Sequence, residues 1–279
     1  MKNQTVYSES SYEFYKKVKS KKTKKDLKLR LGLIDHIIEQ LFEDYDNHYD
    51  DNNLQSLEPH GFVGQPKLDL EELYKYSSKT LTDLQIALTT TPTGRNVKCQ
   101  YCTINAVNTF DHLVPQGFYS EFVVHPKNLF CSCSDCNSRK GAIWRNAGQR
   151  TSLNLYLDQL PNLQYLFVEI DVQNTSIGTR FFLNNTGNID VNLFQILNDH
   201  YTKLGLFKRF SENANDVITS FLLSAEPAFS MGTPEAAKAF ILSSLEKEKV
   251  AFGFNYWETL LKIELLRHPE FLRLLQELV

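Results

Sequence analysis

The sequence predicts an α+β protein that is predominantly helical and carries one small metal-binding module between its helical regions. Three observations lead to this prediction. Apolar residues recur every three or four positions near both ends of the chain, as in helices that face a core. Residues 163–185 are rich in aromatic and β-branched side chains around a turn-prone segment, which indicates a β-hairpin. Two pairs of closely spaced cysteines precede that hairpin.

The composition is that of a globular protein. Of the 279 residues, 42% are apolar and 23% are charged, and the chain is long enough for one large domain or two ordinary ones. No segment approaches the ~18 to 20 uninterrupted apolar residues of a membrane helix, and the first residues lack the apolar core of a signal peptide. We therefore expect no membrane contact and a cytoplasmic location, where cysteines bind metals more often than they form disulfides.

Three parts follow one another along the chain in the predicted organisation. Residues 1–92 form an N-terminal helical region with a basic segment, and its clearest helix covers residues 29–45. Residues 93–150 hold all five cysteines. Residues 151–279 begin with the hairpin and continue as helices. In this last part Thr233 and the two residues after it, Pro and Glu, are strong signals for a helix start, and Pro269 divides the final helical segment.

Charge is unevenly distributed in the N-terminal region. The formal net charge of the chain is −3, whereas nucleic-acid-binding proteins commonly carry a basic surplus. Residues 15–30 nevertheless hold eight lysines and one arginine against one aspartate, and residues 43–52 are strongly acidic. Two interpretations stay open. The basic segment is either a solvated helix or an arm that follows nucleic-acid phosphates and binds them less tightly at high salt.

The cysteine pairs Cys99–Cys102 and Cys133–Cys136 each enclose two residues. Such a gap lets a tight turn direct both sulfurs at one ion, and two pairs complete a tetrahedron without an open position. The sequence therefore predicts a structural Zn²⁺ whose binding contributes to folding. Cys131 is left over as a small buried residue, although it could also replace Cys133. Coincidental free thiols are the alternative; a redox role is disfavoured because neither pair opens a βαβ pattern.

An Asp–His pair, Asp111 and His112, lies between the two cysteine pairs. In an extended segment, adjacent side chains point to opposite faces. A carboxylate oxygen could then bind a hard cation while the imidazole takes the proton of an attacking water. After the second cysteine pair, Asn137 offers an amide oxygen to the same ion, and Arg139 and Lys140 offer positive charge to a phosphate. The combination indicates metal-assisted phosphodiester hydrolysis, although an Asp–His pair alone is more often a surface ion pair or a core histidine.

The stretch CQYC…FDHLVPQGF…HPKNLFCSCSDCNSRKG resembles the HNH endonucleases, or ββα-metal nucleases, in the variant that ends in asparagine. FDHLVPQGF is also similar to the matching segment of the HNH domain in RNA-guided CRISPR nucleases. The resemblance covers about residues 95–145, under a fifth of the chain. It implies a small ββα-metal zinc module embedded between the helical regions.

The resemblance implies a role for each matching residue. His112 would be the general base, and Asp111 and Asn137 would hold one catalytic Mg²⁺ or Mn²⁺. Asn128 would be structural, bonding across the hairpin to hold the loop of His112. The four paired cysteines would bind the zinc, and the two basic residues at the end match the motif only loosely. His125, near Asn128, is a further candidate for the site.

These features together predict a metal-dependent HNH endonuclease that hydrolyses DNA and leaves a 3′-hydroxyl and a 5′-phosphate, as the resemblance implies. One module would nick DNA, and double-strand cutting would need a homodimer or two events. Later segments faintly resemble bacterial phage-defence nucleases of the Septu type, which implies an ATPase partner protein; this chain has no phosphate-binding loop of its own. Two alternatives stay open: a zinc-stabilised nucleic-acid-binding or assembly module without catalysis, and an HNH nuclease that acts on RNA.

Overall fold

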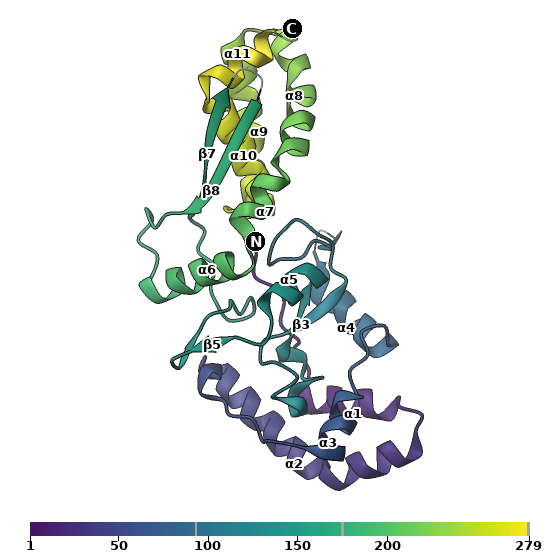
Figure 1. Ribbon diagram of the computed structural model, residues 1–279. Coiled ribbons are helices and arrows are strands. Elements are labelled where there is room, and N and C mark those ends of the chain that lie inside the picture. The colour runs from purple at the N-terminus through teal and green to yellow at the C-terminus, as the bar shows by residue number, and fades with distance from the viewer. Residues whose placement is uncertain (93, 174–175, 278–279) are drawn as a thin grey trace. The chain divides into compact units, whose positions relative to one another are not determined.

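A computed structural model describes residues 1–92, 94–173 and 176–277 (Figure 1). Within these ranges the chain is mostly helical and has four small antiparallel sheets of two strands each, which confirms the predicted α+β, predominantly helical class. Contacts divide the chain into two compact units. The N-terminal unit covers residues 3–101 and 105–159, and the C-terminal unit covers residues 160–279 together with residues 1–2 and 102–104. The three-part division and the ββα-metal assignment stay predictions.

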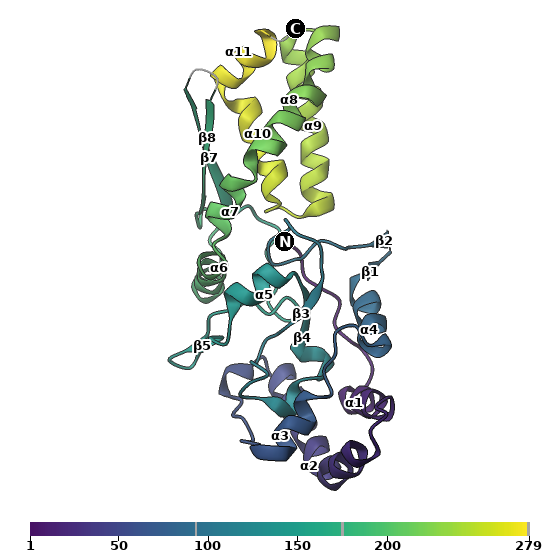
Figure 2. The ribbon, with the colours of Figure 1, turned by 45° about the vertical axis from the view of Figure 1, so that its right-hand side comes forward.

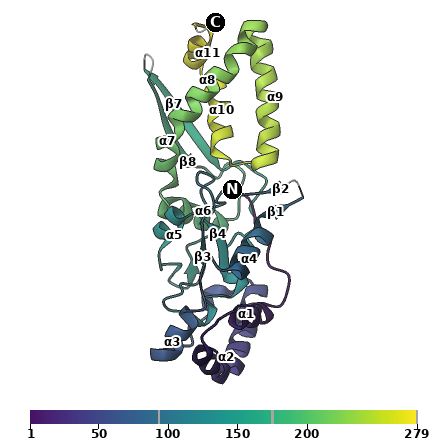
Figure 3. The same ribbon diagram turned by 90° about the vertical axis from the view of Figure 1, so that its right-hand side faces the viewer.

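The N-terminal unit contains helices and short strands in alternation. Its helices are α1 (Ser11–Ser20), α2 (Lys25–Asp50), α3 (Gly64–Glu71), α4 (Lys79–Thr89) and α5 (Ser134–Lys140), with 3₁₀ turns η1 (Leu54–Ser56), η2 (Ser120–Phe122) and η3 (Pro126–Asn128). Its strands are β1 (Thr90–Thr91), β2 (Gly94–Arg95), β3 (Thr109–His112), β4 (Leu129–Ser132), β5 (Arg145–Asn146) and β6 (Gln149–Arg150). The β3–β4 pair lies between α5 and α4 (Figures 2 and 3).

The C-terminal unit combines one long hairpin with six helices among its described residues. The elements are β7 (Leu166–Gln173), β8 (Ser176–Leu183), α6 (Val191–Lys203), α7 (Leu206–Glu212), α8 (Ala214–Met231), α9 (Pro234–Phe252), α10 (Trp257–Arg267) and α11 (Pro269–Glu277). The hairpin packs against α7 and α10 (Figure 1). It confirms the predicted strands, while residues 174 and 175 of the predicted turn lie outside the described residues.

The predicted helix signals of the C-terminal unit are present. The Thr233 hydroxyl accepts a hydrogen bond from the Ala236 amide, and Pro234 occupies the first turn of α9. Pro269 starts α11 directly after α10 has ended at Arg267. Of the helices in the described ranges, none has a segment sufficiently long and apolar to cross a membrane.

Helix α2 carries the core of the N-terminal unit. Its apolar side chains at three- and four-residue spacing are buried, as the sequence predicts: Leu27, Leu31, Ile38, Phe42, Tyr45 and Tyr49. The basic segment spans the end of α1 and the start of α2, and acidic partners compensate part of its charge. Lys19 pairs with Asp35, and Lys24 pairs with Glu72. Arg30 binds Asp69 through two nitrogens, at 2.6 and 2.8 Å. These pairs favour a role in packing for at least part of the segment.

Glu121 in η2 is a buried carboxyl group with incomplete hydrogen bonding. Its Oε1 accepts a hydrogen bond from the His60 amide at 2.8 Å, while Oε2 has no partner among the described residues. Burial raises the pKa of Glu121 above its ordinary value. The folded state therefore favours the protonated carboxyl, and the stability that this form provides is lost as pH rises through the folded pKa.

Replacing Glu121 by Gln should stabilise the protein at neutral pH, because a neutral amide removes the cost of a buried carboxylate. We expect Glu121→Gln to melt roughly 2–4 °C higher than wild type at pH 7. The gain should shrink as pH falls toward the ordinary carboxyl pKa, where wild type is also neutral. Thermal melts from pH 4.5 to 8 measure this, with Glu43→Gln at an exposed position of α2 as control. A gain independent of pH would contradict the explanation.

Candidate active site

The candidate site is built on a strand–strand–helix unit. In the antiparallel pair, Asp111 of β3 lies opposite Phe130 of β4, and His112 lies opposite Leu129. Strand β4 leads through Cys133 into α5, where the Cys133 sulfur accepts a hydrogen bond from the Cys136 amide at 3.4 Å. The sequence thus places Asp111 and His112 at the end of β3, and α5 follows directly after the partner strand.

Four cysteine sulfurs form a buried cluster beside this unit. The Sγ atoms of Cys99, Cys102, Cys133 and Cys136 lie within 4.8 Å of one another. Tetrahedral zinc with Zn–S bonds of about 2.3 Å needs sulfurs about 3.8 Å apart, so a small contraction closes the cluster around one ion. The Ile104 amide donates to Cys102 at 3.4 Å, and such donors stabilise thiolates. These four cysteines can therefore hold one metal ion, and the all-thiolate donor set suits structural zinc.

Cys131 is not a member of this cluster, so the alternative in which it replaces Cys133 is wrong. Its side chain is buried, and burial raises the pKa of the thiol to about 12. A thiol with such a pKa stays protonated and unreactive at neutral pH. This agrees with the predicted role of Cys131 as a small packing residue.

Asp111 is 2% exposed and has a hydrogen bond at each carboxylate oxygen. Lys140 Nζ lies 3.2 Å from Oδ1, and the Tyr101 hydroxyl donates to Oδ2 at 3.1 Å. Burial raises the pKa of Asp111, and the Lys140 charge and the Tyr101 hydrogen bond oppose this rise. Tyr101 lies between Cys99 and Cys102 in the chain. The segment that carries the first cysteine pair therefore also donates a hydrogen bond to the Asp111 carboxylate.

Lys140 is 3% exposed, and its ammonium group has acceptors on the protein. Besides Asp111 it donates to the carbonyl oxygens of His112, at 2.7 Å, and Leu113, at 3.4 Å. Three acceptors occupy the three N–H groups of a lysine, so this geometry favours anchoring of α5 to β3 over phosphate binding. Arg139 is exposed and pairs with Asp135 on the same helix at 2.8 Å.

His112 is held in one tautomer. Its Nε2 lies 2.9 Å from the Val123 carbonyl oxygen. A carbonyl oxygen only accepts, so Nε2 carries the proton and the neutral ring keeps its lone pair on Nδ1. Burial lowers the pKa of His112 to about 4, so the imidazole is neutral at physiological pH. The Tyr74 ring packs against His112 in a T-shaped contact, with 4.9 Å between ring centroids.

Asn128 is fully buried and links the start of β4 to the loop after His112. Its Oδ1 accepts from the Val114 amide at 2.9 Å, and its Nδ2 donates to the carbonyl oxygens of Val114 and Phe122. The Tyr45 hydroxyl of α2 also reaches Oδ1, at 3.4 Å. This bonding holds the loop that carries the Val123 carbonyl and so supports the position of the His112 ring.

One cavity brings three of the predicted site residues together. It has a volume of about 250 Å³, and we call it the site cavity. Its lining residues are Tyr74, Thr109, Phe110, Asp111, His112, Pro115, Gln116, Gly117, Asn137, Gly141 and Ala142. At about 30 Å³ per water, this is room for roughly eight water molecules, enough for a phosphate group with its ligands. Among the described residues, no side-chain hydrogen bond occupies the half-buried Asn137, so its amide oxygen is available to a ligand.

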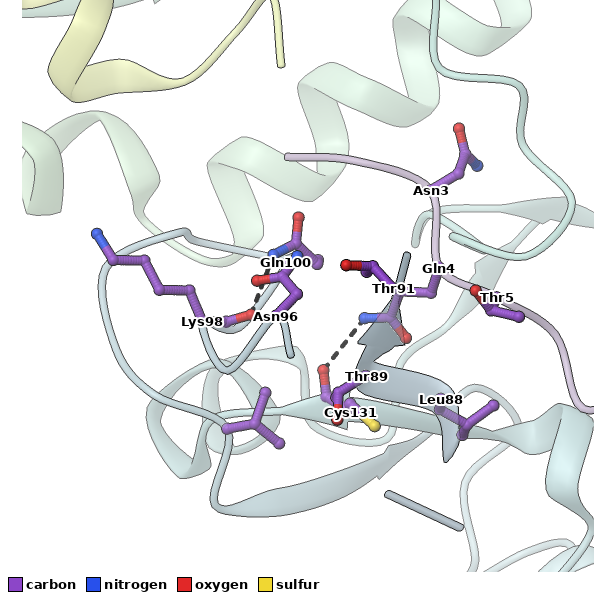
Figure 4. Close-up of a pocket in the computed structure, with 11 residues that line it drawn as sticks. Asn3, Gln4, Thr5, Leu88, Thr89, Thr91, Asn96, Lys98, Gln100 and Cys131 are labelled. Atoms are coloured by element: carbon purple, nitrogen blue, oxygen red, sulfur yellow. Dashed lines mark hydrogen bonds between the residues drawn. The ribbon is translucent and has the colours of Figure 1, made fainter. Parts of the chain in front are cut away.

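A second cavity, lined in part by Cys131 of β4, is too small for a substrate. Its volume is about 40 Å³, and its wall includes the N-terminal residues Asn3 to Thr5 (Figure 4). Gln4 donates from Nε2 to the Cys131 carbonyl oxygen at 3.3 Å, and its Oε1 lacks a partner among the described residues. One bound water fits this volume and would satisfy that oxygen. The site cavity is therefore the better candidate for chemistry.

Sequence reasoning missed three contributors to the site. Tyr101 had a signal, because it lies inside the first cysteine pair. Tyr74 and the Val123 carbonyl had none, since neither belongs to a recognisable motif. His125 does not line the site cavity. Its ring instead packs in an aromatic cluster, 4.0 Å from the Tyr45 ring centroid.

Comparisons with known proteins add little to this geometry. No family model matches the chain, and no solved structure matches it. Over 64 residues the chain is 36% identical to protein ea31 of Escherichia phage lambda. The aligned stretch covers 22% of this chain and 22% of that protein, so the chain matches about a fifth of this relative's length. Membership of the HNH family stays a prediction.

Removal of one cluster cysteine should abolish metal binding. We expect one zinc ion per chain in wild type and a loss of zinc with reduced thermal stability in Cys136→Ser, because three thiolates no longer close the site. Cys131→Ala is the matched control, since Cys131 is equally buried but lies outside the cluster. Elemental analysis and thermal melts of the three proteins measure this. Equal zinc content in wild type and Cys136→Ser would contradict the assignment.

Proposed function

We propose that this chain is a metal-dependent endonuclease of the HNH type that hydrolyses DNA phosphodiester bonds. The observation that carries this proposal is that His112, whose Nε2 is engaged by the Val123 carbonyl oxygen, lines the same cavity as Asp111 and Asn137. A neutral imidazole beside two hard oxygen donors is the combination that metal-assisted hydrolysis needs. The fold alone does not imply the activity.

In this proposal His112 is the general base. Its Nδ1 takes a proton from the water that attacks the phosphorus. Because Nε2 already donates to the Val123 carbonyl oxygen, the ring does not need to rotate before it accepts the proton. The same carbonyl then stabilises the imidazolium that forms, since its partial negative charge faces the Nε2–H group.

Asp111 and Asn137 would hold the divalent ion. A carboxylate and an amide carbonyl are hard oxygen ligands of the kind that Mg²⁺ and Mn²⁺ prefer, so the donor set fits. The ion, when bound, would stabilise the charge that develops on the phosphate and the leaving oxygen. Tyr101 and Lys140 support the site by orienting the Asp111 carboxylate, as second-layer partners of metal ligands commonly do.

The biological setting is part of the proposal and rests on the sequence resemblance alone. We propose a bacterial anti-phage role with an ATPase partner protein, and a homodimer where both DNA strands are cut. An RNA substrate, or a binding module without catalysis, would use the same zinc cluster. The cleavage assay below separates these outcomes.

Loss of His112 should abolish cleavage without loss of fold. We expect wild type to nick supercoiled plasmid with Mg²⁺ or Mn²⁺ and to stop with EDTA. His112→Ala should be slower by about 10² to 10⁴-fold, the usual contribution of a general base. His36→Ala, in α2 and outside the site cavity, is the matched control.

Zinc content and thermal melts of the same samples establish that each variant is folded. Equal cleavage by wild type and His112→Ala would contradict the assignment of the base. Cleavage of RNA but not plasmid would replace DNA by RNA as the substrate. A third outcome is that folded, zinc-loaded wild type cleaves neither nucleic acid, alone or with the proposed ATPase partner protein. That result would favour the non-catalytic alternative.

A further inference from the structure

Tyr74 lies far from the motif residues in sequence but lines the site cavity with them. It belongs to the connection between α3 and α4, within the N-terminal helical region. Its ring meets the His112 ring at an interplanar angle of 67°. Aromatic rings favour edge-to-face contacts of this kind over a face-to-face arrangement.

A single hydrogen bond leaves the His112 ring incompletely fixed. The torsion that turns a histidine ring has a broad energy minimum with two opposite orientations. A half-turn would bring a ring carbon, in place of Nε2, toward the Val123 carbonyl oxygen and would move Nδ1 as well. The Tyr74 ring lies directly beside His112, with 4.9 Å between the ring centroids, and a neighbour this close restricts the motion of the imidazole.

We propose that Tyr74 is a positioning residue that holds the His112 imidazole in the orientation with Nδ1 available as the base. The inference rests on the proposed nuclease function for its catalytic meaning, but the orientation itself is a property of the protein without Mg²⁺ or Mn²⁺. The proposal also gives the N-terminal helical region a role in the site, because this region supplies Tyr74 to the lining of the site cavity.

The ring of Tyr74, and not its hydroxyl, carries this role. The hydroxyl lies beside Thr109 and the Phe110 backbone but makes no hydrogen bond of normal geometry with the described residues. Phenylalanine at this position therefore preserves the contact with His112. Alanine removes the ring and leaves the imidazole free to turn.

The neighbouring contacts keep Tyr74 in place. Leu73 is buried in the core. Tyr76, two residues further along, contacts Phe110 of β3 in a T-shaped pair with 5.7 Å between centroids. Tyr76 therefore packs on the same strand as Tyr74, but within the described part of the chain it has no ring contact with His112 and does not line the site cavity, which makes it a matched control.

The positioning role is tested by a comparison of full-length wild type with Tyr74→Ala, Tyr74→Phe and Tyr76→Ala. The first readout is ¹⁵N NMR of the histidine side chains in zinc-loaded protein without Mg²⁺ or Mn²⁺, with His112 identified by the signal missing in His112→Ala. Wild type, Tyr74→Phe and Tyr76→Ala should show one tautomer with the proton on Nε2. Tyr74→Ala should show averaged shifts from a mixture of tautomers. Tyr74→Val, which is smaller than the ring but keeps an apolar side chain, replaces Tyr74→Ala if that variant does not fold.

The second readout is plasmid nicking. Tyr74→Ala should lower kcat by about 10- to 100-fold with little change in KM, because a small misplacement of a catalytic group has a cost of this size. Tyr74→Phe should restore the wild-type rate. An unchanged tautomer in Tyr74→Ala, or an equal loss in Tyr74→Phe, would overturn the proposal. A changed tautomer with no cleavage by any protein would support the positioning role and count against the nuclease function.

Discussion

The burial of the Asp111 carboxylate is the constraint on which the site depends. A carboxylate out of water is costly unless donors and positive charge compensate it. Tyr101 and Lys140 provide this compensation at the two oxygens. Tyr101 belongs to the first cysteine pair, and Lys140 is the last residue of α5. Through these two hydrogen bonds Asp111 of β3 connects the cysteine segment and the helix to the strand pair.

The cysteine cluster explains how these donors stay in place. Tyr101 lies between Cys99 and Cys102 in the chain. Lys140 follows Cys136 in helix α5. A metal ion bound to all four sulfurs would therefore hold both donors of Asp111 through the chain segments that carry them. This gives a physical reason for an Asp–His pair between two cysteine pairs: the same clamp that stabilises the module also orients its carboxylate. The bonds between zinc and the four sulfurs would then both stabilise the fold and keep the donors of Asp111 in position.

Local signals in the sequence predicted helix α2, the start of α9 and the cysteine cluster. The apolar spacing of α2, the Thr233 cap and the cysteine spacing each act within a few residues, so the sequence contains them directly. Asp111, His112 and Asn137 were placed together by motif order, and the site cavity joins them. The burial of Lys140 was not predictable, because its acceptors include two backbone carbonyls that only the folded strand presents. Tyr74 was equally hidden, since its contact with His112 depends on how the α3–α4 connection packs on β3.

Anomalous diffraction from crystals of the full chain with Mn²⁺ tests the central claim most directly, because it locates both metal ions without relying on cleavage conditions. We predict a zinc peak among the four cysteine sulfurs and a manganese peak in the site cavity, bound to oxygen atoms of Asp111 and Asn137. Manganese absent from an open and intact site cavity, or bound only elsewhere on the chain, would contradict the account.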